Sequence, residues 1–230
     1  MSHCSVIAID GPSGSGKSTV AKRLASELGI LYIDTGAMFR ALAYSANEKD
    51  IDLDSDYEVS KFLEQIKLEY QTSDGALIKI DGEDLSEQIR AHHVSKLASI
   101  ISQIPSVREY LLKFQRNLAA SKTCVMEGRD IGTVVFPEAF SKFFITASIE
   151  IRAKRRYDQL VENGQSDVDM NQLVKDVAKR DQKDMGREVA PLKKADDAEL
   201  VDTSEMALDY VISHLADSVK KKAHQFGIDL

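Results

Sequence analysis

A glycine-rich stretch near the start of the chain carries the residue types that bind nucleotide phosphates. Gly11, four further residues, and then Gly16, Lys17 and Ser18 fit the pattern G-x-x-x-x-G-K-[ST]. Glycines let the backbone N–H groups converge on phosphate oxygens, the lysine reaches the β- and γ-phosphates, and the hydroxyl can bind Mg²⁺. We therefore predict a site for ATP with Mg²⁺ as cofactor and Ser18 as metal ligand, formed by Gly11, Pro12, Ser13, Gly14, Ser15, Gly16, Lys17, Ser18 and Thr19. The alternative is a glycine-rich turn with an ordinary surface lysine.

The elements that such a loop needs lie on both sides of it. Residues 5–10 are apolar enough for a buried strand, and an apolar stripe of helical spacing follows at 20–28. Further buried strands are predicted at 31–33, 123–126, 143–147 and 200–201, with helical segments between them. The predicted fold class is therefore α/β, a P-loop NTPase core whose parallel sheet is flanked by helices. In the last helix we expect Met206, Tyr210, Leu215 and Val219 to face inward.

Polar residues follow two of the predicted strands at the point where each strand ends. Thr35 and Arg40 come after the strand at 31–33, and Arg129 and Asp130 come after the strand at 123–126. Ligands of parallel sheets gather at the carboxyl ends of the strands. We therefore expect these four side chains to share the crevice of the glycine-rich loop. Solvated side chains on a helix and a loop are the alternative.

Two segments break the alternation of strands and helices. Residues 66–82 change to a period of two around the turns Asp74-Gly75 and Asp81-Gly82, which predicts an antiparallel meander inserted outside the main sheet. Residues 151–189 form two basic helices joined by a polar turn at 162–168. Arginines on two short helices suit a lid that closes on a triphosphate, and a solvated helical hairpin is the alternative.

The amino-acid composition indicates which kinds of partner to expect. The chain has 230 residues, with 30 Lys and Arg against 37 Asp and Glu, so its net charge is −7. A basic surface for nucleic acid is therefore not expected. Cys4 and Cys124 form no metal-ligand pattern, and neither a signal peptide nor a membrane span is evident. We expect a cytoplasmic monomer that acts on small molecules without a nucleic-acid or membrane partner.

Together these features predict a small phosphotransferase. Phosphoryl transfer needs positioning and charge neutralisation rather than a covalent intermediate, so cationic side chains are the candidates for catalysis. The predicted catalytic residues are Lys17, Arg129, Arg152, Arg156 and Arg187.

Four motifs taken together resemble those of the bacterial cytidylate kinases with a long insertion, which are nucleoside monophosphate kinases. They are IDGPSGSGKST at 9–19, DTGAMFR at 34–40, EGRDIGTVVFP at 127–137 and KRDQKDMGREVAPL at 179–192. The resemblance implies direct in-line transfer of a phosphoryl group from ATP to CMP or dCMP. It also implies a single kinase domain with a core at about 1–65, 105–150 and 190–230, an NMP-binding insertion containing antiparallel strands at about 66–104, and a helical lid at about 151–189.

The resemblance also implies roles for individual residues. Thr35, Arg40 and Arg129 would hold the acceptor phosphate, Ser99, Arg108 and Asp130 would contact the cytosine, Arg180 and Asp184 would meet the ribose, and Arg187 would lie near the reacting phosphates. A carboxylate suits cytosine, because it accepts a hydrogen bond from the exocyclic amino group that uracil lacks. Phe39 stands where the family commonly has Tyr, so a hydroxyl contact is lost there.

Three other functions remain open from the residues alone. A related P-loop kinase could act on UMP or on a non-nucleotide alcohol. A nucleotide-dependent regulatory switch would be expected to carry N-K-x-D, which does not occur in this sequence. A nucleic-acid-stimulated ATPase fits poorly with the net charge of −7.

Overall fold

The computed structural model describes residues 5–71, 73, 75–120, 122–162, 164 and 168–230 and divides into two compact units. We call residues 1–33 and 118–230 the core unit and residues 34–117 the insert unit. The insert unit is larger than the predicted insertion at about 66–104, because it also contains the helices on either side of that segment.

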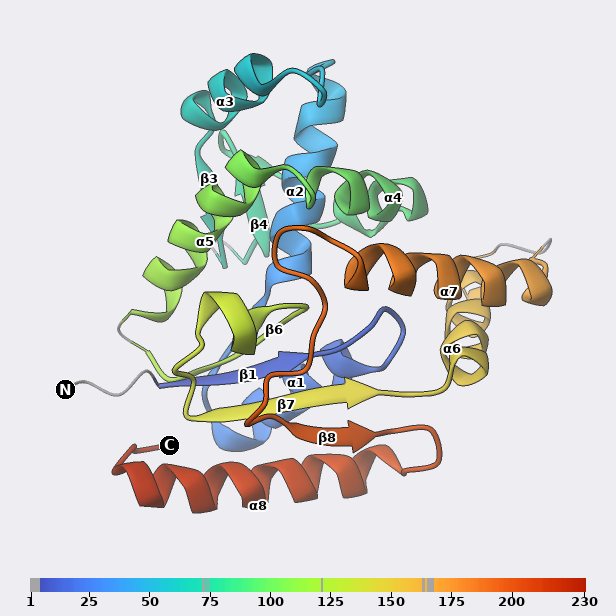
Figure 1. Cartoon of the computed structure of the whole chain (residues 1–230). Helices are drawn as coiled ribbons and strands as arrows, with labels where there is room; N and C mark the ends of the chain where they lie inside the picture. The colour runs from blue at the N-terminus through green and yellow to red at the C-terminus, as the bar shows by residue number, and fades with distance from the viewer. Residues whose placement is uncertain (1–4, 72, 74, 121, 163, 165–167) are drawn as a thin grey trace. The chain divides into compact units, whose positions relative to one another are not determined.

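The core unit is built on a five-stranded parallel sheet with the strand order β2-β6-β1-β7-β8 (Figure 1). Its strands are β1 (Val6–Asp10), β2 (Leu31–Asp34), β6 (Cys124–Gly128), β7 (Ser141–Thr146) and β8 (Glu199–Asp202). Both β1 and β6 are buried along their whole length, as expected of central strands covered on two faces. Val6 lies opposite Cys124, and Ile9 lies opposite Glu127. The predicted parallel sheet is confirmed.

Two pairs of helices complete the core unit. Helices α1 (Lys17–Leu28) and α8 (Leu208–Phe226) pack together against the sheet in one apolar cluster, which includes Leu24, Phe143 and Leu215 (Figure 1). Helices α6 (Ile149–Glu162) and α7 (Met170–Met185) form a hairpin with a small cluster of their own around Ala153, Leu160 and Leu173. Most of the polar turn predicted between them lies outside the described residues.

The inward face of α8 differs from the prediction. Leu215 and Val219 are buried as expected, but Met206 precedes the helix and is exposed, and Tyr210 is 63% exposed. Tyr210 instead stacks on His214, which is one turn further along the same helix. The buried stripe begins at Val211, so the predicted face was rotated by one position at the start of the helix.

The insert unit combines helices with the predicted meander. Its elements are α2 (Thr35–Glu48), α3 (Asp56–Gln65), β3 (Leu68–Tyr70), β4 (Ile78–Ile80), β5 (Glu83–Asp84), the 3₁₀ turn η1 (Gln88–Arg90), α4 (His92–Ile101) and α5 (Pro105–Ala119). Strands β3, β4 and β5 pair antiparallel in sequence order. At the second hairpin Asp81 and Gly82 both have positive φ, +54° and +84°, which is the geometry of a two-residue type I′ turn. The turn predicted at Asp74-Gly75 lies partly outside the described residues.

Asp81 fastens this hairpin to its surroundings. Its carboxylate accepts hydrogen bonds from the Lys67 N–H and from Lys49 Nζ on α2, both at 2.8 Å. These two donors lower the pKa of Asp81.

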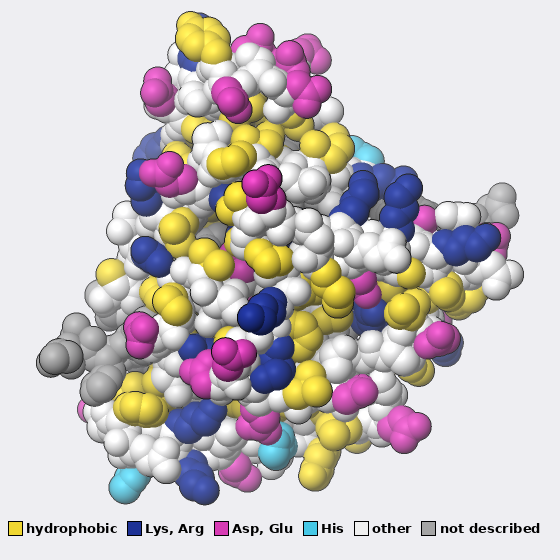
Figure 2. All heavy atoms as spheres, viewed as in Figure 1, with side chains coloured by type: hydrophobic (Ala, Val, Ile, Leu, Met, Phe, Trp, Pro, Cys, Tyr) yellow, Lys and Arg dark blue, Asp and Glu magenta, His cyan; other side chains and the backbone are white. Residues whose placement is uncertain are grey.

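The surface of the protein carries charges of both signs. On the face shown in Figure 2, Lys and Arg side chains are interspersed with Asp and Glu side chains. In the described part of the chain, none of the helices combines the length and hydropathy that crossing a membrane would require.

Candidate functional site

The glycine-rich loop connects β1 to α1, and strand β7 and helix α6 restrict its path. A Cβ atom on Gly11 would lie only 2.0 Å from the carbonyl oxygen of Ile145 on β7, so no larger residue fits there. Gly14 and Gly16 have φ of +76° and +85°, in the region that favours glycine. Three of the glycines in the predicted loop are thus required by its geometry.

Cationic side chains hold three carbonyl groups of the loop. Lys17 Nζ lies 3.3 Å from the carbonyl oxygen of Pro12, Arg152 Nη1 lies 3.1 Å from that of Ser13, and Arg155 Nη1 lies 3.1 Å from that of Ser15. The hydroxyl of Ser15 is buried and has no hydrogen-bond partner among the described residues. The loop is therefore fixed through its carbonyls, which suits a loop whose N–H groups bind an anion.

A buried glutamate lies next to the predicted metal ligand. Glu127, at the end of β6, accepts hydrogen bonds from Ser18 Oγ at 2.8 Å and from the hydroxyl of Tyr32 at 2.5 Å. Hydroxyl and carboxylate oxygens side by side suit Mg²⁺, which takes one or two protein ligands and keeps several waters. Among the described residues there is no group of three or more His, Cys, Asp or Glu side chains that could hold a metal by themselves.

Asp10, the last residue of β1, holds the loop that follows β6. Its two carboxylate oxygens accept hydrogen bonds from the N–H groups of Ile131 and Gly132, both at 2.8 Å, at the start of the π-helical turn η2 (Ile131–Val135). Burial raises the pKa of Asp10 to about 7, although the two N–H donors act in the opposite direction. Arg129 and Asp130 therefore lie between the end of β6 and the turn η2, and the hydrogen bonds from η2 to Asp10 of β1 fix the position of that turn.

The raised pKa of Asp10 predicts a pH-dependent stability. Because the folded-state pKa lies above that of the unfolded chain, the unfolded state loses its proton first as the pH rises. The wild type should therefore lose stability relative to Asp10→Asn between about pH 4 and pH 7, by at most about 1.4 kcal/mol per pH unit. Urea unfolding of both proteins across this range measures the difference. A difference that stays constant with pH would contradict the prediction.

Arginines of the core unit converge on one buried carboxylate. Asp184 of α7 is almost fully buried and accepts hydrogen bonds from Arg129 Nε at 3.1 Å and Arg187 Nη2 at 2.6 Å. Burial and repulsion from other arginines, partly offset by Asp184, lower the pKa of Arg180 to about 10. The Nε of Arg180 is buried without a hydrogen-bond partner among the described residues. Three predicted substrate-binding arginines thus surround a single negative charge, an arrangement ready for an anion.

Two further arginines were predicted to be catalytic, and their surroundings differ. Arg152 is 3% exposed and makes a two-pronged ion pair with Asp181 of α7, at 3.0 and 2.6 Å, in addition to its bonds to the backbone. Arg156 is half-buried and donates to Gln159 on its own helix, and burial lowers its pKa. Arg152 thus connects α6 to α7 and to the phosphate-binding loop, while the bond from Arg156 to Gln159 stays within α6, and a catalytic role for each arginine stays a prediction.

Four predicted acceptor-binding residues belong to the insert unit. Arg40 Nη2 lies 3.0 Å from the carboxylate of Asp34, which also caps α2 by accepting from the Ala37 N–H. Thr35 is buried in the first turn of α2. Arg108 of α5 donates to the carbonyl of Ser102 and places its guanidinium 5.7 Å from the centre of the Phe39 ring. This cation–π contact needs no hydroxyl, and it gives Phe39 a role that sequence reasoning missed.

Ser99, the fourth of these residues, is half-buried on α4. Its carbonyl oxygen accepts hydrogen bonds from the side chains of Ser102 and Gln103. Ser99 and Arg108 lie on α4 and α5, which follow one another along the chain. Both hydrogen-bond to Ser102, Ser99 through its carbonyl oxygen and Arg108 through its guanidinium.

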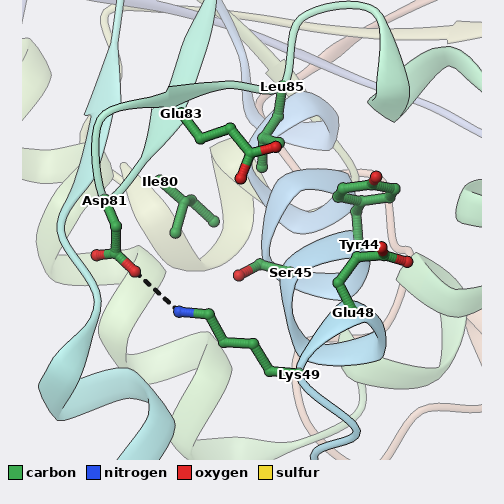
Figure 3. A pocket seen from close by; sticks show the side chains of 8 residues that line it. All are labelled: Tyr44, Ser45, Glu48, Lys49, Ile80, Asp81, Glu83 and Leu85. Carbon is green, nitrogen blue, oxygen red and sulfur yellow. Dashed lines mark hydrogen bonds and ion pairs between the residues drawn. The ribbon is translucent and has the colours of Figure 1, made fainter.

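A separate pocket lies elsewhere in the insert unit, between α2 and the β4–β5 hairpin (Figure 3). It has a volume of about 310 Å³, and the ion pair between Lys49 and Asp81 crosses one side of it. None of the predicted site residues lines it. Its lining residues are Tyr44, Ser45, Glu48, Lys49, Ile80, Asp81, Glu83 and Leu85.

Several residues of the site were not predicted. Asp10 ends β1, and Thr203, whose hydroxyl contacts the carbonyl of Ser15, directly follows β8, so the rule that favoured Thr35 and Arg129 could have identified both. The role of Tyr32 had no comparable signal, because a tyrosine within a strand usually packs as an apolar residue.

A parallel sheet whose first strand leads into a phosphate-binding loop, with an arginine cluster in the same unit, defines a P-loop kinase. Comparison with known proteins narrows this class. A family model described as cytidylate kinase matches residues 7–221. The chain belongs to the cytidylate kinase family and is an enzyme that phosphorylates nucleoside monophosphates.

Individual relatives agree with this assignment. The cytidylate kinase of Shouchella clausii (strain KSM-K16) is 46% identical over 220 residues, covering 95% of this chain and 97% of the relative. That of Bacillus subtilis (strain 168) is 42% identical over 218 residues, covering 94% and 97%. Among solved structures, an uncharacterized protein from Eubacterium ventriosum ATCC 27560 superposes with a TM-score of 0.53 at 15% identity, covering 94% and 98%, which supports the fold alone.

Proposed function

We propose that this enzyme transfers the γ-phosphoryl group of ATP directly, by in-line displacement, to CMP and dCMP, a step of pyrimidine metabolism. The observation that carries the proposal is the set of arginines around Asp184, which provides positive charge in the unit that also holds the phosphate-binding loop. The relatives described above, which are named cytidylate kinases, support CMP as the acceptor. We further propose that the enzyme is a cytoplasmic monomer without a nucleic-acid or membrane partner.

On the donor side, the loop from Gly11 to Thr19 binds the phosphates of ATP through its N–H groups. Lys17 is proposed to leave the carbonyl of Pro12 and donate to the transferring phosphoryl group, with Arg152 and Arg156 as further cations. Ser18 is the proposed ligand of Mg²⁺, with Glu127 beside it. When bound, the metal would neutralise charge on the β- and γ-phosphates.

On the acceptor side, we propose roles for individual residues of each unit. Arg129 and Arg187 reach the phosphates from their positions beside Asp184, while Arg180 and Asp184 contact the ribose. Asp130 accepts from the amino group of cytosine. The residues proposed from the insert unit are Thr35 and Arg40 for the acceptor phosphate, and Ser99 and Arg108 for the base.

Asp130→Asn tests both the activity and the basis of its specificity. The wild type, assayed with ATP, should phosphorylate CMP and dCMP far better than UMP or AMP. An unpaired buried group costs about 1–3 kcal/mol, so the variant should lose about ten- to a hundredfold in kcat/KM with CMP. With UMP it should lose less, because the asparagine amide can donate to the uracil carbonyl.

Measuring all four acceptors on one preparation removes errors in the fraction of active enzyme. No phosphorylation of CMP by the wild type would refute the proposed activity. If CMP and UMP efficiencies fell by the same factor in the variant, a residue other than Asp130 would distinguish the bases.

A further inference from the structure

The first helix of the predicted lid, α6, is joined to the phosphate-binding loop through Arg155, which is not among the predicted catalytic or binding residues. Its Nη1 atom lies 3.1 Å from the carbonyl oxygen of Ser15 and 3.2 Å from Thr203 Oγ1, and its Nη2 atom lies 2.8 Å from the carbonyl oxygen of Thr203. Arg155 is half-buried, and Thr203 is 5% exposed. One guanidinium thus bridges α6, the loop and the segment after β8.

The hydroxyl of Thr203 contacts the same carbonyl oxygen of Ser15. It lies 3.1 Å from this oxygen and 3.0 Å from the carbonyl oxygen of Thr146, at the end of β7. Because a hydroxyl has one hydrogen, it donates to one of these oxygens at a time. The N–H of Thr203 also donates to Thr146, so the position of Thr203 is set by the edge of the sheet.

We propose that Arg155 and Thr203 are positioning residues that set the direction of the Gly16 N–H and thereby the affinity for the phosphates of ATP. The carbonyl of Ser15 and the N–H of Gly16 belong to one planar trans peptide, so they point in opposite directions. A carbonyl held outward by Arg155 turns the N–H inward, toward the bound phosphate. The same argument applies to Arg152, whose bond to the Ser13 carbonyl directs the N–H of Gly14.

The local geometry also explains why glycine is needed at position 16. Gly16 has φ of +85°, and a Cβ atom there would lie 3.3 Å from Arg155 Nη1. A side chain would therefore press on the group that holds the preceding carbonyl. The bond to Ser15 is charge-assisted and partly buried, which makes it stronger than an exposed neutral one.

The proposal rests on the proposed function, because it assigns these residues to an ATP site. The experiment uses the full-length chain with Arg155→Met, which keeps the length of the side chain and removes its donors. Calorimetry should show that a non-hydrolysable ATP analogue binds about ten- to a hundredfold more weakly. Affinity for CMP, kcat at saturating ATP and the melting temperature should change little.

Matched variants separate positioning from charge and packing. Lys154→Met removes an exposed cation from the same helix and should bind the analogue like the wild type. Thr203→Val should weaken analogue binding, whereas Thr203→Ser should restore it, because serine keeps the hydroxyl. Arg155→Lys should fall between wild type and Arg155→Met, since an ammonium reaches one carbonyl but not two in a fixed fork.

The outcomes distinguish this inference from the proposed function. If the wild type did not bind the analogue, the proposed function would fail. If the wild type bound it and both Arg155→Met and Thr203→Val bound it equally well, the inference would be wrong. Equal losses for the analogue and CMP, together with a lower melting temperature, would show a general structural role and also overturn it. If Arg155→Met does not fold, the pair Thr203→Val and Thr203→Ser decides by itself.

Discussion

Replacing Lys17 with methionine is expected to lower kcat for phosphoryl transfer by about 10²–10³-fold while the protein stays folded. Lys17 is buried at the start of α1, and its ammonium group is held only 3.3 Å from the carbonyl of Pro12, within the loop itself. A cation placed there stabilises charge that develops in the transition state, so its loss should affect kcat more than the affinity for CMP. Steady-state kinetics with ATP and CMP, with folding checked by thermal denaturation, measure the effect.

Lys22→Met is the matched control for this variant. Lys22 lies on the same helix and is exposed, so its replacement should leave turnover within about twofold of the wild type and stability within about 0.5 kcal/mol. Turnover close to that of the wild type in a folded Lys17→Met protein would rule out the loop as the site of phosphoryl transfer.

Replacing Asp184 with asparagine should have the largest effect on stability, a loss of about 3–5 kcal/mol. The substitution keeps the shape of the side chain but leaves Arg129 and Arg187 without the carboxylate that lies between them. Arg180 would lose the attraction of Asp184, which opposes the repulsion from neighbouring arginines. Urea denaturation measures the loss directly.

An added anion should compensate for part of this loss. Sulfate is expected to stabilise Asp184→Asn more than the wild type, because a dianion can take the place of the missing charge among the arginines. Asp176→Asn on the same helix is the control. Asp176 is exposed and, among the described residues, accepts only from Gln172, so its loss should cost no more than about 0.5 kcal/mol. Equal stabilities of Asp184→Asn and Asp176→Asn would show that the cluster does not depend on its carboxylate.

Local patterns in the sequence were sufficient to predict the sheet and the phosphate-binding loop. The central strands β1 and β6 are short, buried and largely apolar segments, and each glycine of the loop has a local reason in backbone geometry. The meander was predictable because a change of period and an Asp-Gly turn both lie within a few residues. The boundary of the insert unit was not, because it depends on which helices pack with the meander.

The partners of the arginines could not be predicted from local patterns. Arg152, Arg155 and Arg156 are close together on one helix, and their shared charge favoured a common role as lid cations. In the structure Arg152 pairs with the buried Asp181, and Arg155 contacts the carbonyl of Ser15, which is 140 positions away in the chain. Which arginine of such a group meets a carboxylate, a carbonyl or solvent depends on the tertiary packing and not on spacing.

The position of Cys124 makes it a probe for how often the parallel sheet opens. It begins a fully buried strand opposite Val6, its thiol is shielded from solvent, and it forms no disulfide among the described residues. A thiol reagent can react with it only when β6 separates from its neighbours, so the labelling rate reports how often the middle of the sheet opens. In a Cys4→Ser chain that rate would come from one sulfur, and its slowing by a nucleotide would give the free energy of ligand binding without following any phosphate.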